Sequence, residues 1–152
     1  MNGTLGEAMH EIAFGELGRG EQKRNNDGFH IRKYRMGRRP LGSGSWCATF
    51  LYWCYVQACW ARYSQPKVKR TNSARRLALR LTEIGTIVKY PRKGDIVWFE
   101  RPGVGTHIAI CHDADAFHFR TIDGNKGKFP ADVSLHTHHH RDPNIKRVIR
   151  LG

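Results

Sequence analysis

The sequence contains few cysteines, and their spacing does not suggest a disulfide framework. The four are Cys47, Cys54, Cys59 and Cys111, with no CxxC pair among them. Small secreted domains that rely on disulfides carry denser, paired cysteines. We therefore expect free thiols and synthesis in a reducing compartment.

Long apolar runs are also missing. The N-terminal stretch MNGTLGEAMHEIAFGEL has no basic region and no uninterrupted apolar segment, so it does not read as a secretory signal. No charge occurs from Leu41 to Ala61, but the apolar part of this stretch runs only from Trp46 to Ala61. At about 1.5 Å per helical residue, it is too short to cross a hydrocarbon core of about 30 Å. We predict a buried helix here and no membrane span.

Acidic residues are scarce relative to basic ones. The chain has 26 Lys and Arg residues against 13 Asp and Glu, which gives a net charge of +13. Such a surface attracts polyanions, and nucleic acid, anionic membranes and cell-wall polymers all meet this condition. The charge therefore names a broad class of partner without choosing within it.

The remaining composition is that of a globular protein. With 152 residues, 39% hydrophobic and 11% aromatic, the chain suits one folded domain over residues 1–152. Helical periodicity precedes Gly94 and short strand-like runs follow it, which predicts an α+β fold. The expected helices are Leu5–Leu17, Phe29–Tyr34, Trp46–Arg62 and Ala74–Ile84. The expected strands are Ile96–Phe99, His107–Cys111, Phe117–Ile122 and Val148–Leu151.

Cys47 is the best candidate for a reactive thiol. It follows the basic, Gly-rich loop Arg38–Ser45 and lies in the first turn of a helix for which Ser45 is the expected N-cap. The free N–H groups and positive dipole end of a helix N-terminus stabilise a thiolate. Cys54 and Cys59 lie deeper in the same helix, where burial raises a thiol pKa, so we interpret them as core residues.

His107 is the best-placed base for this thiol. It begins a strand that leaves the loop Gly103–Thr106, so its ring is expected at an open rim of the sheet. A third polar group should hold the other imidazole nitrogen. Asp123 and Asn125, at the end of the next strand, are both candidates for this role.

Four segments together resemble the CHAP family of peptidoglycan hydrolases, in order and in separation. They are Trp46-Cys47-Ala48, Gly94-Asp95-Ile96-Val97-Trp98-Phe99, Thr106-His107-Ile108-Ala109-Ile110 and Thr121-Ile122-Asp123-Gly124-Asn125. The upstream Gly15-Glu16-Leu17-Gly18 and Asn25-Asn26-Asp27-Gly28 also look like that family, so the resemblance runs roughly from Glu7 to Leu151. Only the basic segment Lys67–Arg80 is unusual.

The resemblance implies a papain-like cysteine peptidase fold, with N-terminal helices packed on a small antiparallel sheet. It further implies a cell-wall amidase or endopeptidase that acts through an acyl-enzyme on bacterial peptidoglycan. Cys47 would be the nucleophile, His107 the base, and Asp123 or Asn125 the third residue. In many members the position of Asp123 is glutamate, which leaves both candidates open. We expect a monomer without cofactor, metal or separate wall-binding domain.

The biological setting that we favour is a bacteriolytic phage endolysin. It would be made in the cytoplasm without a signal peptide and would act on the wall after release, while an injected antibacterial amidase effector is the alternative. We expect the basic face formed by Arg75, Arg76 and Arg80 to hold the enzyme on the anionic envelope. A non-enzymatic nucleic-acid-binding module is the rival from another class, but it leaves the Cys, His and Asx motifs unexplained.

Several other polar groups and aromatics are assigned structural roles. The His-rich stretch His136–His140 lacks zinc-like spacing and is interpreted as a solvated loop rather than a metal site. The sets Asn25–Asp27 and Asp113–Asp115 lack a full calcium-binding pattern and are interpreted as turns. Trp46 and Trp98 are interpreted as core or rim packing, with groove lining as the alternative.

Overall fold

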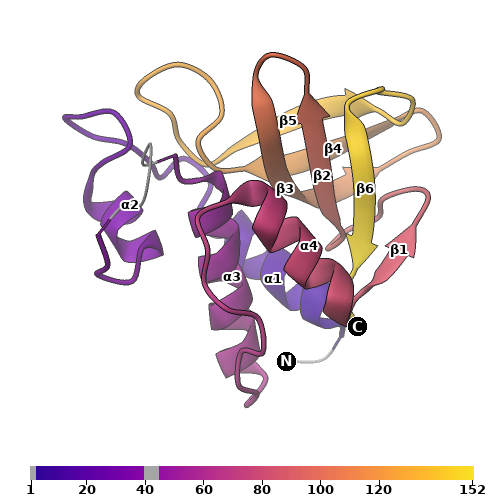
Figure 1. Ribbon diagram of the computed structural model, residues 1–152, viewed down its shortest axis with the longest axis horizontal. Coiled ribbons are helices and arrows are strands. Elements are labelled where there is room, and N and C mark those ends of the chain that lie inside the picture. The colour runs from indigo at the N-terminus through magenta and orange to yellow at the C-terminus, as the bar shows by residue number, and fades with distance from the viewer. Residues whose placement is uncertain (1–2, 40–44) are drawn as a thin grey trace.

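The computed structural model describes residues 3–39 and 45–152 (Figure 1). Along the chain, the helices precede the strands. The helices are α1 (Leu5–Phe14), α2 (Phe29–Tyr34), α3 (Cys47–Ala61) and α4 (Ala74–Ile84). The strands are β1 (Thr86–Val88), β2 (Ile96–Arg101), β3 (Gly105–Ala114), β4 (His118–Asp123), β5 (Ser134–His139) and β6 (Ile145–Arg150).

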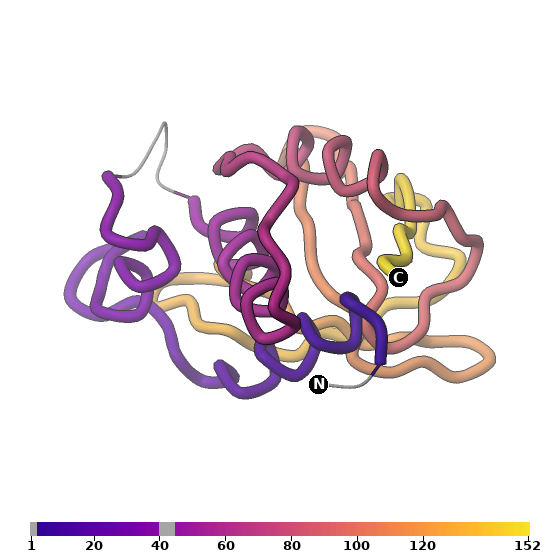
Figure 2. Tube along the Cα trace, turned by 90° about the horizontal axis from the view of Figure 1, so that it is seen from below, coloured from indigo at the N-terminus to yellow at the C-terminus, as the bar shows by residue number. Residues whose placement is uncertain are grey.

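The strands form one antiparallel sheet in the order β1-β6-β2-β3-β4-β5. Helices α1, α3 and α4 all contact β3, and they gather on one side of the sheet, while α2 packs on α3 (Figure 1). The start of α1 lies beside the C-terminal end of the chain (Figure 2), where the Leu5 N–H donates to the Gly152 carbonyl at 3.0 Å. The predicted α+β fold, with helices packed on an antiparallel sheet, is confirmed.

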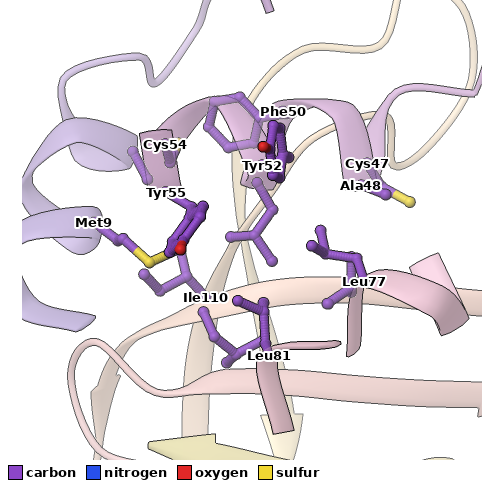
Figure 3. Close-up of a cluster of buried hydrophobic side chains, with 14 of the residues drawn as sticks. Met9, Cys47, Ala48, Phe50, Tyr52, Cys54, Tyr55, Leu77, Leu81 and Ile110 are labelled. Atoms are coloured by element: carbon purple, nitrogen blue, oxygen red, sulfur yellow. The ribbon is translucent and has the colours of Figure 1, made fainter. Parts of the chain in front are cut away.

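Helix α3 is the centre of the helical layer. Buried side chains lie on all its faces, from Cys47 to Cys59, because α1, α2, α4 and the sheet surround it. Its core contacts include Met9 of α1, Leu77 and Leu81 of α4, and Ile110 of β3 (Figure 3). The apolar stretch is thus a buried helix, as predicted. Among the described residues, no helix is both long and apolar enough to cross a membrane.

Both faces of the sheet carry apolar side chains. The face toward the helices joins the main core, and the opposite face holds a smaller cluster. That cluster comprises Val97, Phe99, Ala109, Cys111 and Phe119, with Ile145 packed against it. His107 lies directly opposite Phe99 in the β2–β3 register, so both side chains project from the face away from the helices.

Helix ends follow local chemistry at α1 and α4 but not at α3. Thr4 and Glu7 form a capping box at α1, and the Ser73 side chain accepts from the Arg76 N–H at α4. The expected N-cap of α3 was wrong, since Trp46 occupies that position without a side-chain cap. The Ser45 hydroxyl instead accepts a hydrogen bond from Asn125, and Cys47 becomes the first helical residue.

Other boundaries differ where local pattern is weak. The first helix ends at Phe14 rather than Leu17, with Gly15 as its C-cap. Strands β1 and β5 were not predicted, and most of the predicted loop Arg38–Ser45 lies outside the described residues. The loop interpretation of His136–His140 was wrong for His136–His139, which form β5 beside β4. Short, exposed strands carry little apolar alternation, so their pairing with a neighbour decides them.

Gly124 lets the end of β4 approach the start of α3. A Cβ at this position would lie 2.9 Å from the Trp46 ring and 3.0 Å from the Phe50 Cβ. Both of these side chains are almost fully buried, so neither can move aside easily. Packing therefore leaves no room for a side chain at this position.

We predict that Gly124→Ala destabilises the fold by about 1–3 kcal/mol through overpacking. Gly15→Ala is the matched control, because its Cβ would make ordinary contacts and its φ of −65° is helical. That variant should be neutral or up to about 1 kcal/mol more stable. Urea unfolding measures both, and equal midpoints for Gly124→Ala and the parent chain would contradict the packing argument.

Candidate active site

Cys47 lies where the first turn of α3 meets the start of β3. It is 7% exposed and has a free thiol, at the opposite end of the drawn core from Cys54 (Figure 3). The backbone N–H groups of Ala48 and Ile108 point toward its sulfur and stabilise the thiolate. The predicted placement of Cys47 in the first turn of this helix is confirmed.

His107 and Asp123 form a buried hydrogen bond in the sheet. The His107 Nε2 lies 2.6 Å from the Asp123 Oδ2, and the two residues are 3% and 0% exposed. They come from adjacent strands, β3 and β4, whose antiparallel register brings their ends together. Because Nε2 faces Asp123, the ring presents Nδ1 to the Cys47 thiol, to which His107 is also hydrogen-bonded.

The three groups favour a thiolate and an imidazolium. Burial alone would raise the pKa of Cys47, but its hydrogen bond to His107 and the charge of the ring lower that pKa below its ordinary value. Burial alone would lower the pKa of His107, yet the hydrogen bonds to Asp123 and Cys47 raise it to about 9. The hydrogen bond between the two side chains therefore favours the proton on the ring and the negative charge on sulfur.

Asp123 stays ionised although it is fully buried. Desolvation raises its pKa, but the hydrogen bond and charge of His107 outweigh that effect and hold the pKa below its ordinary value. The Thr121 hydroxyl also donates to Asp123 Oδ1. A buried carboxylate that accepts from two donors and faces a cation is compensated for the loss of water.

The other cysteines lack this environment. Burial raises the pKa of Cys54 well above its ordinary value, raises that of Cys59, and raises that of Cys111 to about 12. Cys54 and Cys59 belong to the main core, as expected. Among the four cysteines, Cys47 has the environment that activates a thiol.

Asn125 holds the loop before Cys47 rather than the imidazole. Its Nδ2 donates to the Ser45 Oγ at 2.7 Å, and its backbone φ is +55°. Asp123 is therefore the residue that contacts His107, and Asn125 bridges the β4 end to the start of α3. The sequence left both options open because only two residues separate them.

The sequence did not predict that Thr121 and His138 lie next to Asp123. The Thr121 Oγ1 lies 2.9 Å from the His138 Nε2 of β5. Since the single Thr121 hydroxyl proton goes to Asp123, His138 Nε2 donates to Thr121. Burial lowers the pKa of His138 to about 4, so its ring is neutral at pH 7. The register of β4 with β5 places His136 and His138 on the face of Thr121 and Asp123, and no local sequence pattern indicated this pairing.

The tryptophans pack rather than line a groove. Trp46 is fully buried and its ring stacks with Tyr34 at 5.8 Å. Trp98 is 4% exposed and donates to Glu100 at 3.0 Å. The core interpretation of both is confirmed, and the groove alternative is wrong.

The remaining polar sets act within the fold. Asp27 pairs with Arg32, Asp113 pairs with Arg120, and Asp115 accepts from the backbone at Phe117 and His118. Among residues 3–39 and 45–152, no three His, Cys, Asp or Glu side chains are arranged to hold a metal ion.

The predicted basic face is partly occupied by internal contacts. Arg75 pairs with Glu100 through two hydrogen bonds, and Arg80 donates to the carbonyl oxygens of Lys69 and Arg70. Arg76 is exposed on α4, and Lys67 and Lys69 of the preceding segment are also exposed. Of the three predicted arginines, the Arg76 side chain thus makes no internal polar contact among the described residues, whereas Arg75 and Arg80 are engaged within the fold.

We predict that Asp123→Asn shifts the ionisation of Cys47 to higher pH. Without the carboxylate, the pKa of His107 falls, the imidazolium no longer forms at neutral pH, and the thiolate loses its counter-charge. Alkylation of Cys47 by iodoacetamide, followed by mass spectrometry across pH 4 to 10, should begin below the ordinary thiol range in the parent chain. Its onset should move toward the pH of an ordinary thiol, near 9, in the variant.

Asn125→Gly is the control for this experiment. Glycine accepts the positive φ at this position, and the substitution removes a side chain that contacts Ser45 rather than His107. The onset should stay where it is in the parent chain. If Asn125→Gly shifted the onset and Asp123→Asn did not, Asn125 rather than Asp123 would control the ionisation of Cys47.

Comparison with known proteins agrees with this geometry. A family model described as the CHAP domain matches residues 39–125, more than half of the chain, and this range contains Cys47, His107, Asp123 and Asn125. Searches among curated proteins and among solved structures returned no match. The chain therefore belongs to the CHAP domain family, which indicates peptidoglycan hydrolysis as its class of activity.

Proposed function

We propose that the protein is a cysteine-dependent peptidoglycan amidase or endopeptidase. The observation that carries this proposal is the hydrogen-bonded chain from Cys47 through His107 to Asp123, at a helix N-terminus, in a member of the CHAP domain family. A thiolate beside an imidazolium is the arrangement that nucleophilic acyl transfer requires.

In the proposed reaction, Cys47 and His107 each act once in each half-reaction. The Cys47 thiolate attacks the carbonyl carbon of an amide in the wall peptide, and the backbone N–H of Cys47 donates to the oxyanion that forms. The His107 imidazolium gives its proton to the amine nitrogen as the C–N bond breaks, which leaves a thioester. His107 then takes a proton from water, the hydroxide attacks the thioester, and the acid and the Cys47 sulfur are released.

Asp123 orients the ring and supports its positive charge during both half-reactions. Its hydrogen bond to Nε2 directs Nδ1 at the sulfur, and its negative charge stabilises the imidazolium. We propose that Asn125 contributes indirectly, by holding Ser45 and thus the entry to α3.

We predict that Cys47→Ala lowers the rate of wall hydrolysis by roughly a thousandfold or more, with the fold retained. Turbidity of purified peptidoglycan reports the rate, and circular dichroism reports the fold. Cys59→Ala, on the same helix, is the matched control and should keep most of the activity. An unchanged rate in Cys47→Ala would reject the mechanism.

The Cys47→Ala experiment also distinguishes a hydrolase from a nucleic-acid-binding module. A basic nucleic-acid-binding module would show no hydrolysis in any variant, and its polyanion binding would persist in Cys47→Ala and weaken with salt. Mass spectrometry of the digested wall then distinguishes an amidase from an endopeptidase. An amidase frees the N-terminus of the first stem residue, whereas an endopeptidase frees a terminus within the peptide.

We favour a phage endolysin as the biological setting over an injected antibacterial effector. The support is the net charge of +13, which would keep the enzyme on an anionic envelope. Loss of the gene should delay lysis of the host cell at the end of a phage cycle. Unchanged lysis with reduced killing of neighbouring cells would favour the effector instead.

Retention on the wall can be tested at exposed basic residues outside the internal pairs. Charge reversal at Lys67, Lys69 and Arg76, all exposed, should weaken binding to purified wall at low salt, and added salt should reduce the difference. Arg75 and Arg80 stay unchanged because they make internal contacts. A sedimentation assay measures the bound fraction, and undiminished binding would remove this surface from the proposal.

A further inference from the structure

A small pocket opens directly beside His107, on the sheet face away from the helices. Its volume is about 80 Å³. It is lined by Phe99, Arg101, His107, Lys126, His138, Asp142 and Asn144. A water molecule takes about 30 Å³ in the liquid, so the pocket has room for a group of a few heavy atoms.

Two cations of this pocket have no ion-pair partner among the described residues. Lys126 and Arg101 are both half-buried, and neither forms a salt bridge or a side-chain hydrogen bond in that part of the chain. The Arg101 Nε is itself buried without a partner. Burial lowers the pKa of Lys126. The charges of Asp123 and Asp142 raise that pKa and the charge of Arg101 lowers it, so the two cations oppose each other although both carboxylates lie within electrostatic range.

The other charged groups of the pocket do not neutralise this pair. Asp142 is the one carboxylate in the lining, and its Oδ1 accepts from the Asn144 backbone N–H at 2.9 Å. Asp123 lies behind, where His107 and Thr121 already occupy its oxygens. The His138 ring is neutral at pH 7. With the His107 charge paired with Asp123 and one of the two cations offset by Asp142, one positive charge remains in excess at the pocket.

We propose that this pocket binds a carboxylate of the substrate, through Lys126 and Arg101. A half-buried ammonium and guanidinium can each donate a charge-assisted hydrogen bond to a carboxylate, and a pocket of this size admits that group with little else. Binding would relieve the repulsion between the two cations. The proposal rests on the proposed function, because it assigns the pocket to the same substrate.

The position of the pocket says which part of the substrate carries the carboxylate. His107 lines the pocket and Cys47 does not. In the proposed reaction His107 protonates the departing amine, so a group held beside it belongs to the amine side of the cleaved bond. The preferred substrate is thus a peptide with a free acidic group close to the amine that is released.

The test compares Lys126→Met with Lys128→Met. Lys128 is exposed, two residues along the same loop and outside the pocket lining, and its substitution changes the net charge equally. Two walls serve as substrate, one untreated and one in which carbodiimide and ammonium have converted free carboxylates to amides. On untreated wall, Lys126→Met should lose about tenfold in kcat/KM, the loss of one charge-assisted hydrogen bond. Lys128→Met should match the parent chain.

On amidated wall, the parent chain and Lys126→Met should hydrolyse at the same rate. Equal rates of Lys126→Met and Lys128→Met on untreated wall would overturn the pocket assignment while leaving the proposed function intact. Failure of the parent chain on both walls would instead count against the proposed function.

A binding measurement tests the pocket even if the parent chain hydrolyses neither wall. Acetate and acetamide have the same size and differ in charge, and the NMR signals of the His107 ring report what enters the pocket. Acetate should shift these signals in the parent chain and in Lys128→Met, and should shift them at least about tenfold less in Lys126→Met at equal concentration. Equal shifts by acetate and acetamide, or no shift at all, would overturn the carboxylate assignment.

Discussion

The buried hydrogen bond between His107 and Asp123 is the interaction on which the site depends. A carboxylate that is fully removed from water is costly unless it faces a cation and accepts further hydrogen bonds. Here the imidazole supplies the cation and Thr121 supplies a second donor. In return the carboxylate keeps the ring protonated and aimed at Cys47, so one pair sets both the charge and the direction of the imidazole.

The architecture holds this pair in place by register and by packing. The ends of β3 and β4 meet because the strands are antiparallel neighbours, and α3 directs its first residue at that edge. Every residue of α3 from Cys47 to Tyr52 is buried, so the N-terminus of this helix has little freedom to shift relative to the sheet. Gly124 and Asn125 complete the junction, the first by admitting the Trp46 ring and the second by bonding Ser45.

The face of the sheet away from the helices has a polar half and an apolar half. Phe99 and Phe119 pack there, and the rings of both contact His138. Towards the strand ends the same face becomes charged, with Asp123 and the pocket residues Lys126 and Arg101. The histidines of β5 lie at this transition, where alternate residues of the strand are half-buried.

The sequence by itself determined the class of fold, most helix positions and the residues of the candidate site. Helical periodicity places Phe29–Tyr34 and Ala74–Ile84 as observed, because each helix buries one stripe of its own residues. The Cys, His and Asx motifs also stand in the sequence, since a nucleophile at a helix start and a base at a strand start are local features. Strands β1 and β5 could not be read in the same way, because short exposed strands gain their stability from a neighbour that is distant in sequence.

Only the tertiary structure decided which of the two Asx residues contacts His107. Asp123 and Asn125 are two positions apart, and strand alternation does not extend into the turn that holds Asn125 at a positive φ. The same holds for Thr121, His138, Lys126 and Arg101, whose proximity to His107 follows from the pairing of β2 with β3, β3 with β4 and β4 with β5. Hydrogen bonds and charges between strands depend on register, and register is fixed by the packing of the whole sheet rather than by any one segment.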